Sequence, residues 1–130
     1  MNIVLAAGVF DILHPGHLYF LRQAKALGDT LVVVITSDAT ARKQGKKTVF
    51  SEVERLALVQ SLAFVDKVVV GVKGEAFGSI IEIKPDMVAL GYDQWQNVSK
   101  LKNELNKLGW QGELVRIKKY GNYASSKVKK

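Results

Sequence analysis

Residues 8–17 read Gly-Val-Phe-Asp-Ile-Leu-His-Pro-Gly-His, and this stretch decides the fold. It follows an apolar run at residues 3–7, which is typical of a strand buried on both faces. It precedes residues 18–24, where apolar side chains recur at three-residue spacing, and Gly28 then provides a stop signal. The predicted order is therefore a buried strand, a tight loop and a helix.

The beginning of this predicted helix is suited to an anion. Pro15 fits the first helical turn, because it has no N–H to lose and its φ is already helical. Gly16 leaves the backbone N–H groups open to a phosphate, which the positive end of the helix dipole favours. His14 and His17 are three residues apart, so both imidazoles can face the same way. A phosphate site is thus predicted, with a plain capping or surface role as the alternative.

A zinc site is a poor alternative for the two histidines. The chain has no cysteine, and no third ligand stands at a typical zinc spacing. The absence of cysteine also excludes a disulfide framework and thiol chemistry.

Composition indicates one soluble globular domain spanning residues 1–130, with 48% hydrophobic and 24% charged residues. The apolar N-terminal run has no basic segment before it, so we expect a core strand there and not a signal peptide. No apolar run approaches the ~20 residues of a membrane-spanning helix. A cytoplasmic protein without membrane partners is expected.

The formal net charge of +7 predicts an acidic partner. The basic residues gather at 42–47 and again at 116–130, without the interleaved aromatic platform of single-strand binders. Nucleotides and phosphorylated metabolites are therefore favoured over nucleic acid. The last basic residues could also be only a solvated chain end.

Strand and helix patterns alternate along the whole chain. Later strands are predicted at residues 31–35, 67–70, 87–90 and 113–117, the last at an edge, and helices at 51–62, 76–83, 97–108 and 124–130. Ser51 and Glu54 have the spacing of a capping box, and a basic, turn-prone segment occupies residues 42–47. This order predicts an α/β fold, a Rossmann-like doubly wound five-stranded parallel sheet with its ligand at the carboxyl ends of the strands.

Residues 10–17 resemble the His-x-x-His signature of the nucleotidylyltransferase superfamily, whose members include cytidylyltransferases and small adenylyltransferases. Residues 84–94 and 116–119 carry a closer likeness to the archaeal-type FAD synthases, which are FMN adenylyltransferases. The same family pattern is also found in glycerol-3-phosphate cytidylyltransferases.

The resemblance implies roles for particular residues. His14, His17 and Lys46 are the implied catalytic residues. The implied nucleotide-binding residues are Val9, Phe10, Asp11, His14, Gly16, His17, Lys47, Arg55, Gly91, Tyr92, Asp93, Arg116, Tyr120, Ser125, Ser126 and Lys127. Members usually carry Thr at the position of Val9, so one hydroxyl contact is absent here. Members also have an arginine upstream of their carboxy-terminal signature, and Arg116 and Lys119 are the two candidates for its counterpart here.

Several of these residues have simpler alternatives. Asp11 could cap a turn, or it could orient a histidine or help to hold Mg²⁺. Lys46 and Lys47 could form an exposed basic loop, and Arg55 could pair with Glu52 on one helix face. Ser125 and Ser126 could be plain helix caps. Tyr92 and Trp95 could be core aromatics, or they could join Tyr120 and Tyr123 in a wall for an isoalloxazine ring.

The resemblance implies transfer of a nucleoside monophosphate from a nucleoside triphosphate to a phosphorylated acceptor, with release of pyrophosphate. ATP and FMN are the implied substrates, Mg²⁺ accompanies the nucleotide, and a homodimer is expected. The alternatives are a CTP-dependent enzyme acting on glycerol 3-phosphate or another acceptor, and a basic nucleotide- or nucleic-acid-binding module without turnover.

Overall fold

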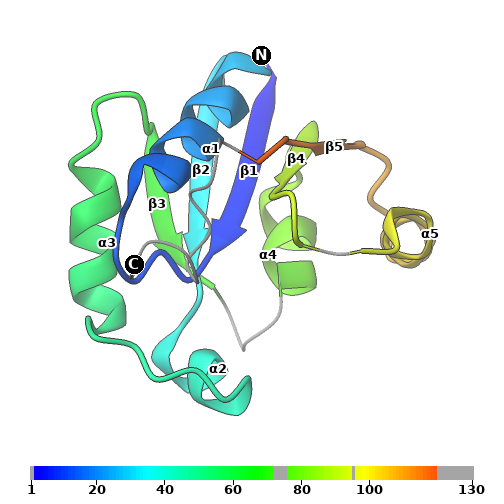
Figure 1. The fold of residues 1–130 in the computed structure, drawn as a ribbon. Helices are drawn as coiled ribbons and strands as arrows, with labels where there is room; N and C mark the ends of the chain where they lie inside the picture. The colour runs from blue at the N-terminus through cyan, green and yellow to red at the C-terminus, as the bar shows by residue number, and fades with distance from the viewer. Residues whose placement is uncertain (1, 72–75, 95, 120–130) are drawn as a thin grey trace.

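The computed structural model describes residues 2–71, 76–94 and 96–119, which form a parallel sheet with helices on both faces (Figure 1). The strands are β1 (Ile3–Gly8), β2 (Thr30–Ile35), β3 (Lys67–Val70), β4 (Met87–Leu90) and β5 (Glu113–Arg116). The helices are α1 (Pro15–Ala26), α2 (Asp38–Lys43), α3 (Glu52–Gln60), α4 (Ala76–Ile83) and α5 (Val98–Lys107). The predicted α/β class and five-stranded parallel sheet are confirmed.

The strand order is β3-β2-β1-β4-β5, and all neighbouring strands run parallel. The chain builds outward from β1 to β3 in one direction and then crosses back to place β4 on the other side of β1. The order therefore reverses between β1 and β4. In open α/β sheets, ligands bind in the crevice at the carboxyl ends of the strands at this point.

Two apolar clusters fill the two faces of the sheet, because successive side chains of a strand point to opposite faces. Val4 and Ala6 of β1 belong to the cluster beneath α1 and α3, which includes Leu21 and Val59. Leu5 of β1 belongs to the cluster beneath α4 and α5. Burial on both faces explains why β1 and β2 are continuous apolar runs without alternation.

The predictions of β3, α4 and β4 are confirmed with the predicted bounds, whereas α2 was missed. The six residues of α2 are too few to show a helical apolar period, and basic residues at its end suggested a turn. The helix is capped by Ser37, whose Oγ accepts a hydrogen bond from the Thr40 amide at 3.1 Å. Thr40 and Ala41 are buried, so tertiary packing stabilises it.

The predicted helix over residues 124–130 lies outside the described residues and stays a prediction. Within the described part of the chain, no helix is both long and apolar enough to cross a membrane.

The capping box at the beginning of α3 is confirmed. The Ser51 Oγ accepts from the Glu54 amide at 3.2 Å, and the Glu54 carboxylate accepts from the Ser51 amide at 2.9 Å. The two amides would otherwise lack an intrahelical partner.

We expect Ser51→Ala to lower the free energy of unfolding by about 1 kcal/mol, because one amide at the start of α3 loses its acceptor. Urea unfolding of the parent and the variant measures this difference. Ser61→Ala is the matched control at the other end of α3, where the Ser61 hydroxyl donates to the exposed Leu58 carbonyl, which water can hydrate instead. A loss for Ser61→Ala as large as that for Ser51→Ala would contradict the capping explanation.

Candidate active site

Two histidines cap α1. His14 is the N-cap residue, and its Nδ1 accepts a hydrogen bond from the Gly16 amide at 3.0 Å. The Nδ1 of His17 accepts from the His14 amide at 3.3 Å, which completes a capping box. Imidazoles here occupy the places that Ser or Thr and Glu or Gln usually take. Since backbone N–H groups donate to both Nδ1 atoms, the proton of each neutral imidazole is on Nε2.

The two imidazoles lie side by side at the carboxyl end of β1. Their ring centroids are 3.9 Å apart, and the rings are stacked at 26°. This arrangement agrees with the expectation from their three-residue spacing. The capping role and a phosphate-facing role are therefore compatible, because each uses a different nitrogen.

Burial favours the neutral form of both histidines. It lowers the pKa of His17 to about 4, with the neighbouring His14 adding to this effect. The Ile12 backbone and the charge of Asp93 oppose the shift in the pKa of His17. Burial lowers the pKa of His14 as well. The surroundings of both rings thus favour neutral N–H donors over positive charge.

Phe10 packs behind the histidines in an unusual backbone conformation. Its φ is +50°, in the left-handed region that L residues rarely adopt. Its buried ring meets the His17 ring edge-to-face at a centroid distance of 5.6 Å. The ring also covers Gly8, where a Cβ would stand only 2.8 Å from the Phe10 Cε2 atom. Gly8 and Phe10 therefore pack against each other in the turn that leads from β1 to the histidines.

The loop after β4 lies against the end of β1. Gln94 donates to the Ala7 carbonyl at 3.0 Å and accepts from the Gly91 amide at 2.9 Å. Arg116 of β5 donates to the Gly91 carbonyl at 2.6 Å and to the Gln94 carbonyl. Gln94 belongs to the stretch 84–94 that carries the family likeness, but its contact with β1 was not predicted, because nothing in its local sequence shows that its amide reaches back to residue 7.

Tyr92 and Asp93 stand on this same loop. Tyr92 is 41% exposed, and the Lys119 ammonium lies 5.6 Å from the centre of its ring. Tyr92 is thus a partly open aromatic surface beside a cation and not a core residue. Gly91, Tyr92, Asp93 and Arg116 thus lie together at the carboxyl ends of β4 and β5, and their contact with a nucleotide stays a prediction.

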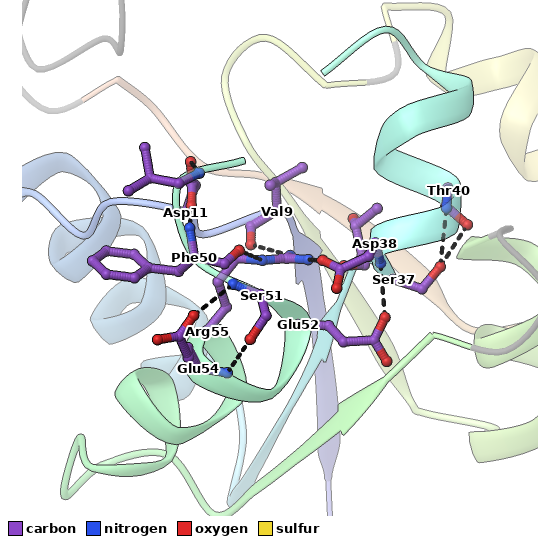
Figure 2. Close-up of polar contacts among 12 residues, drawn as sticks. Val9, Asp11, Ser37, Asp38, Thr40, Phe50, Ser51, Glu52, Glu54 and Arg55 are labelled. Carbon is purple, nitrogen blue, oxygen red and sulfur yellow. Dashed lines mark hydrogen bonds and ion pairs between the residues drawn. The ribbon is translucent and has the colours of Figure 1, made fainter. Parts of the chain in front are cut away.

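Arg55 requires a correction. The prediction made it a phosphate ligand or the partner of Glu52, but its side chain is fully buried on α3. It donates to the carbonyls of Phe50, Val9 and Thr36, and forms an ion pair with Asp38 at 2.8 Å (Figure 2). Four of its five N–H groups are thereby used inside the protein.

Glu52 also has a different partner from the predicted one. Its carboxylate accepts from the Asp38 amide at 2.8 Å (Figure 2). The hydrogen bond from Arg55 is the main cause of a lowered pKa for Asp38, and a hydrogen bond from the backbone amide of Glu52 to the Asp38 carboxylate adds to it. Arg55, Asp38 and Glu52 together hold the loops after β1 and β2 to the start of α3.

The carboxylate of Asp11 binds backbone amides of the segment before α3. Its two carboxylate oxygens accept from the backbone amides of Val49 and Phe50 at 2.8 and 2.9 Å (Figure 2). This is closest to the capping alternative, except that the capped amides are 38 and 39 residues away. Lys46 and Lys47, just before these amides, are exposed.

The remaining predicted residues cannot be placed. Tyr120, Ser125, Ser126 and Lys127 lie outside the described residues, as do Trp95 and Tyr123. Their roles stay predictions.

A separate open hollow of about 630 Å³ lies between α5 and the beginning of β5. Asp86, Lys102 and Glu113 are among its lining residues, and none of the predicted site residues is. Asp86 and Glu113 mark the amino ends of β4 and β5, so this hollow is at the edge of the sheet opposite the histidines.

Comparison with known proteins agrees with this geometry. The family model described as cytidylyltransferase-like matches residues 5–130. The chain belongs to the cytidylyltransferase-like family. Its proposed signature residues, His14 and His17, lie within the matched part, and the family assignment makes the chain a nucleotidyltransferase enzyme.

The cytidylyltransferase-like chain is 47% identical over 129 residues to a protein named FAD synthase from Thermoplasma volcanium, covering 98% of this chain and 91% of that one. It is 46% identical to the FAD synthase of Thermoplasma acidophilum, covering 96% and 89%. Among solved structures, the lipopolysaccharide core biosynthesis protein of Thermoplasma volcanium superposes with a TM-score of 0.89 and 48% identity, over 93% of this chain and 99% of that one. The resemblance stated from residues 10–17 and 84–94 is therefore confirmed.

The lowered pKa of His17 predicts a pH dependence of stability. Between its ordinary value of 6.5 and about 4, the unfolded chain binds a proton at His17 that the folded chain does not. The free energy of unfolding therefore falls as the pH drops through this window and is fully retained above it. Urea midpoints at pH 7 and pH 4.5 measure the fall.

His17→Gln is the matched control for this measurement, because Gln can accept the same capping hydrogen bond but does not titrate. Acidic side chains titrate in both proteins, so the difference between them isolates His17. An equal fall in the parent and in His17→Gln would contradict the assignment to His17.

Proposed function

We propose that this chain transfers AMP from ATP to FMN. An oxygen of the FMN phosphate forms a bond to the α-phosphorus of ATP, the bond from that phosphorus to the bridging oxygen of the β-phosphate breaks, and pyrophosphate leaves. The FAD synthase name of relatives at 46–47% identity supports these substrates. The stacked histidine pair that caps α1 at the switch point supports the reaction type and is the observation that carries the proposal.

The histidines act as donors in this scheme. Nucleotidyl transfer needs little covalent chemistry from the protein, since alignment and stabilisation of charge on the phosphate oxygens do most of the work. With Nδ1 held by the cap, each Nε2–H of His14 and His17 donates to oxygens of the reacting phosphate or the departing pyrophosphate. The cap fixes the direction of both N–H bonds before the substrate arrives, so orientation costs little at the moment of reaction.

Cationic side chains provide the charge that the neutral histidines do not. Lys46 and Lys47 are exposed just before the segment held by Asp11, where they can neutralise triphosphate oxygens. Ser125, Ser126 and Lys127 are proposed to hold the β- and γ-phosphates on the resemblance alone. The partly exposed Tyr92 ring is proposed as part of the wall for the isoalloxazine ring.

Magnesium is proposed to arrive with ATP. Within the described residues, no group of three or more His, Asp or Glu side chains is placed to hold a metal ion. Both oxygens of Asp11 are used by backbone amides. Since Mg²⁺ commonly binds substrate phosphates and keeps several waters, it would neutralise charge on the triphosphate without a dedicated protein site.

Two further properties are proposed. The resemblance alone implies a homodimer, which sedimentation equilibrium would test. The absence of an interleaved aromatic platform favours small-molecule substrates over nucleic acid.

Two replacements of His17 distinguish its role in capping α1 from its role in the reaction. We expect His17→Gln to keep the cap and the melting temperature within a few degrees, but to lower kcat roughly 100-fold, because its amide cannot place a donor where the imidazole Nε2–H lies. Pyrophosphate release with ATP and FMN measures kcat, and calorimetry measures the melting temperature. His17→Ala should lose both activity and stability. Full activity in either variant would remove His17 from the mechanism.

A substrate matrix tests the choice of nucleotide and acceptor. ATP and CTP are each combined with FMN, glycerol 3-phosphate and a sugar 1-phosphate, and pyrophosphate is measured. We expect release with ATP and FMN at least 100-fold above the other pairs, and FAD as the product. Preference for CTP with glycerol 3-phosphate would instead support the cytidylyltransferase alternative.

The parent protein and its histidine variants also test the alternative that the chain is a binding module without enzymatic turnover. A basic binding module would release no pyrophosphate from any pair, and it would bind single strands in a salt-sensitive way that survives loss of both histidines.

A further inference from the structure

The carboxylate of Asp11 joins two segments that are far apart in sequence. It stands in the turn that leads from β1 to the histidines. Its oxygens accept from the amides of Val49 and Phe50 at 2.8 and 2.9 Å. Hydrogen bonds to a charged acceptor are the stronger kind. The turn and residues 49–50 are thus connected by a two-point contact (Figure 2).

Arg55 fastens the same two segments from the buried side. Its Nε donates to the Phe50 carbonyl at 3.1 Å, and its Nη1 donates to the Val9 carbonyl at 2.8 Å. Phe50 therefore has its amide held by Asp11 and its carbonyl held by Arg55. The position of residues 49–50 relative to the histidine turn is determined on both sides of the backbone.

Lys46 and Lys47 lie between two backbone contacts, one at residues 49–50 and one at the end of α2. The amide of Lys46 donates to the Ala41 carbonyl at the end of α2, at 2.9 Å. Lys47 is two residues before Val49, and both lysine side chains are exposed. With the backbone held before and after them, the region that their ammonium groups can reach is limited by the Asp11 contact.

We propose that Asp11 is a positioning residue that acts through Lys46. It holds the basic segment against the histidine turn, so that the ammonium group reaches the phosphates that the imidazoles also contact. Asp11 itself touches no substrate in this scheme. The inference rests on the proposed function for its catalytic consequence, whereas the positioning of the segment can be tested without any substrate.

The catalytic test is a double-mutant cycle with Asp11→Asn and Lys46→Ala. Asn has the shape of Asp, but it presents an oxygen to one of the two amides and an NH₂ group to the other. We expect Asp11→Asn to lower kcat/KM for ATP about tenfold through displacement of Lys46. In the Lys46→Ala background the same change should have an effect within about twofold, since no ammonium group is left to displace.

Additive losses in the cycle would overturn the inference, because they would show that Asp11 acts independently of Lys46. An Asp11→Asn variant with parental kcat/KM would overturn it too. Asp66→Asn is the matched control and should leave kcat/KM unchanged. Its carboxylate also accepts a backbone amide, that of Leu31 at 2.7 Å, but at the amino end of the strands.

Limited proteolysis tests the positioning itself. Trypsin cleaves after Lys and Arg, and residues 42–47 contain four such sites. We expect Asp11→Asn to be cut in this segment several-fold faster than the parent and Asp66→Asn, at equal global stability. Equal rates would overturn the inference whether or not the chain turns over ATP and FMN. If no substrate pair releases pyrophosphate but Asp11→Asn is still cleaved faster, only the proposed function is wrong, and the positioning role of Asp11 stands.

Discussion

The buried guanidinium of Arg55 joins the loops that lie beside the predicted site. Arg55 lies within the apolar layer beneath α3, where an uncompensated charge would be strongly unfavourable. The carbonyls of Val9, Thr36 and Phe50 and the carboxylate of Asp38 compensate it. These groups belong to the loops after β1 and β2 and to the segment before α3. Satisfying one buried cation therefore requires three otherwise separate loops to meet, and the site is built where they do.

The second constraint is the beginning of α1. Its first amides need acceptors, and the chain provides two imidazoles for them. This choice has a chemical consequence, because an imidazole that accepts at Nδ1 must carry its proton at Nε2 and cannot be protonated without losing the cap. In the proposed reaction, His14 and His17 thus combine a structural role with a chemical one. Phe10, in its left-handed conformation over Gly8, keeps the His17 ring in place from behind.

Local patterns predicted much of this accurately. The spacing of Ser51 and Glu54 predicted the start of α3, because a capping box involves only four consecutive residues. The apolar runs of β1 to β4 predicted a parallel sheet, because strands covered by helices on both faces have no polar side. The pattern failed for α2, whose six residues are stabilised mainly by burial of Thr40 and Ala41. No local pattern records that burial.

The sequence by itself determined the class of fold, the position of the helix that begins at the histidines and the family of chemistry, since each depends on neighbouring residues or on spacing along the chain. Only the tertiary structure decided the functions of the charged residues. Arg55 resembles a phosphate ligand in the sequence, but its acceptor at Val9 is 46 residues away and inside the protein. Asp11 resembles a metal or histidine partner, but it holds amides 38 and 39 residues away. A charged side chain binds whichever compensating group the folded chain brings close to it. The separation of two residues along the sequence does not give their separation in space.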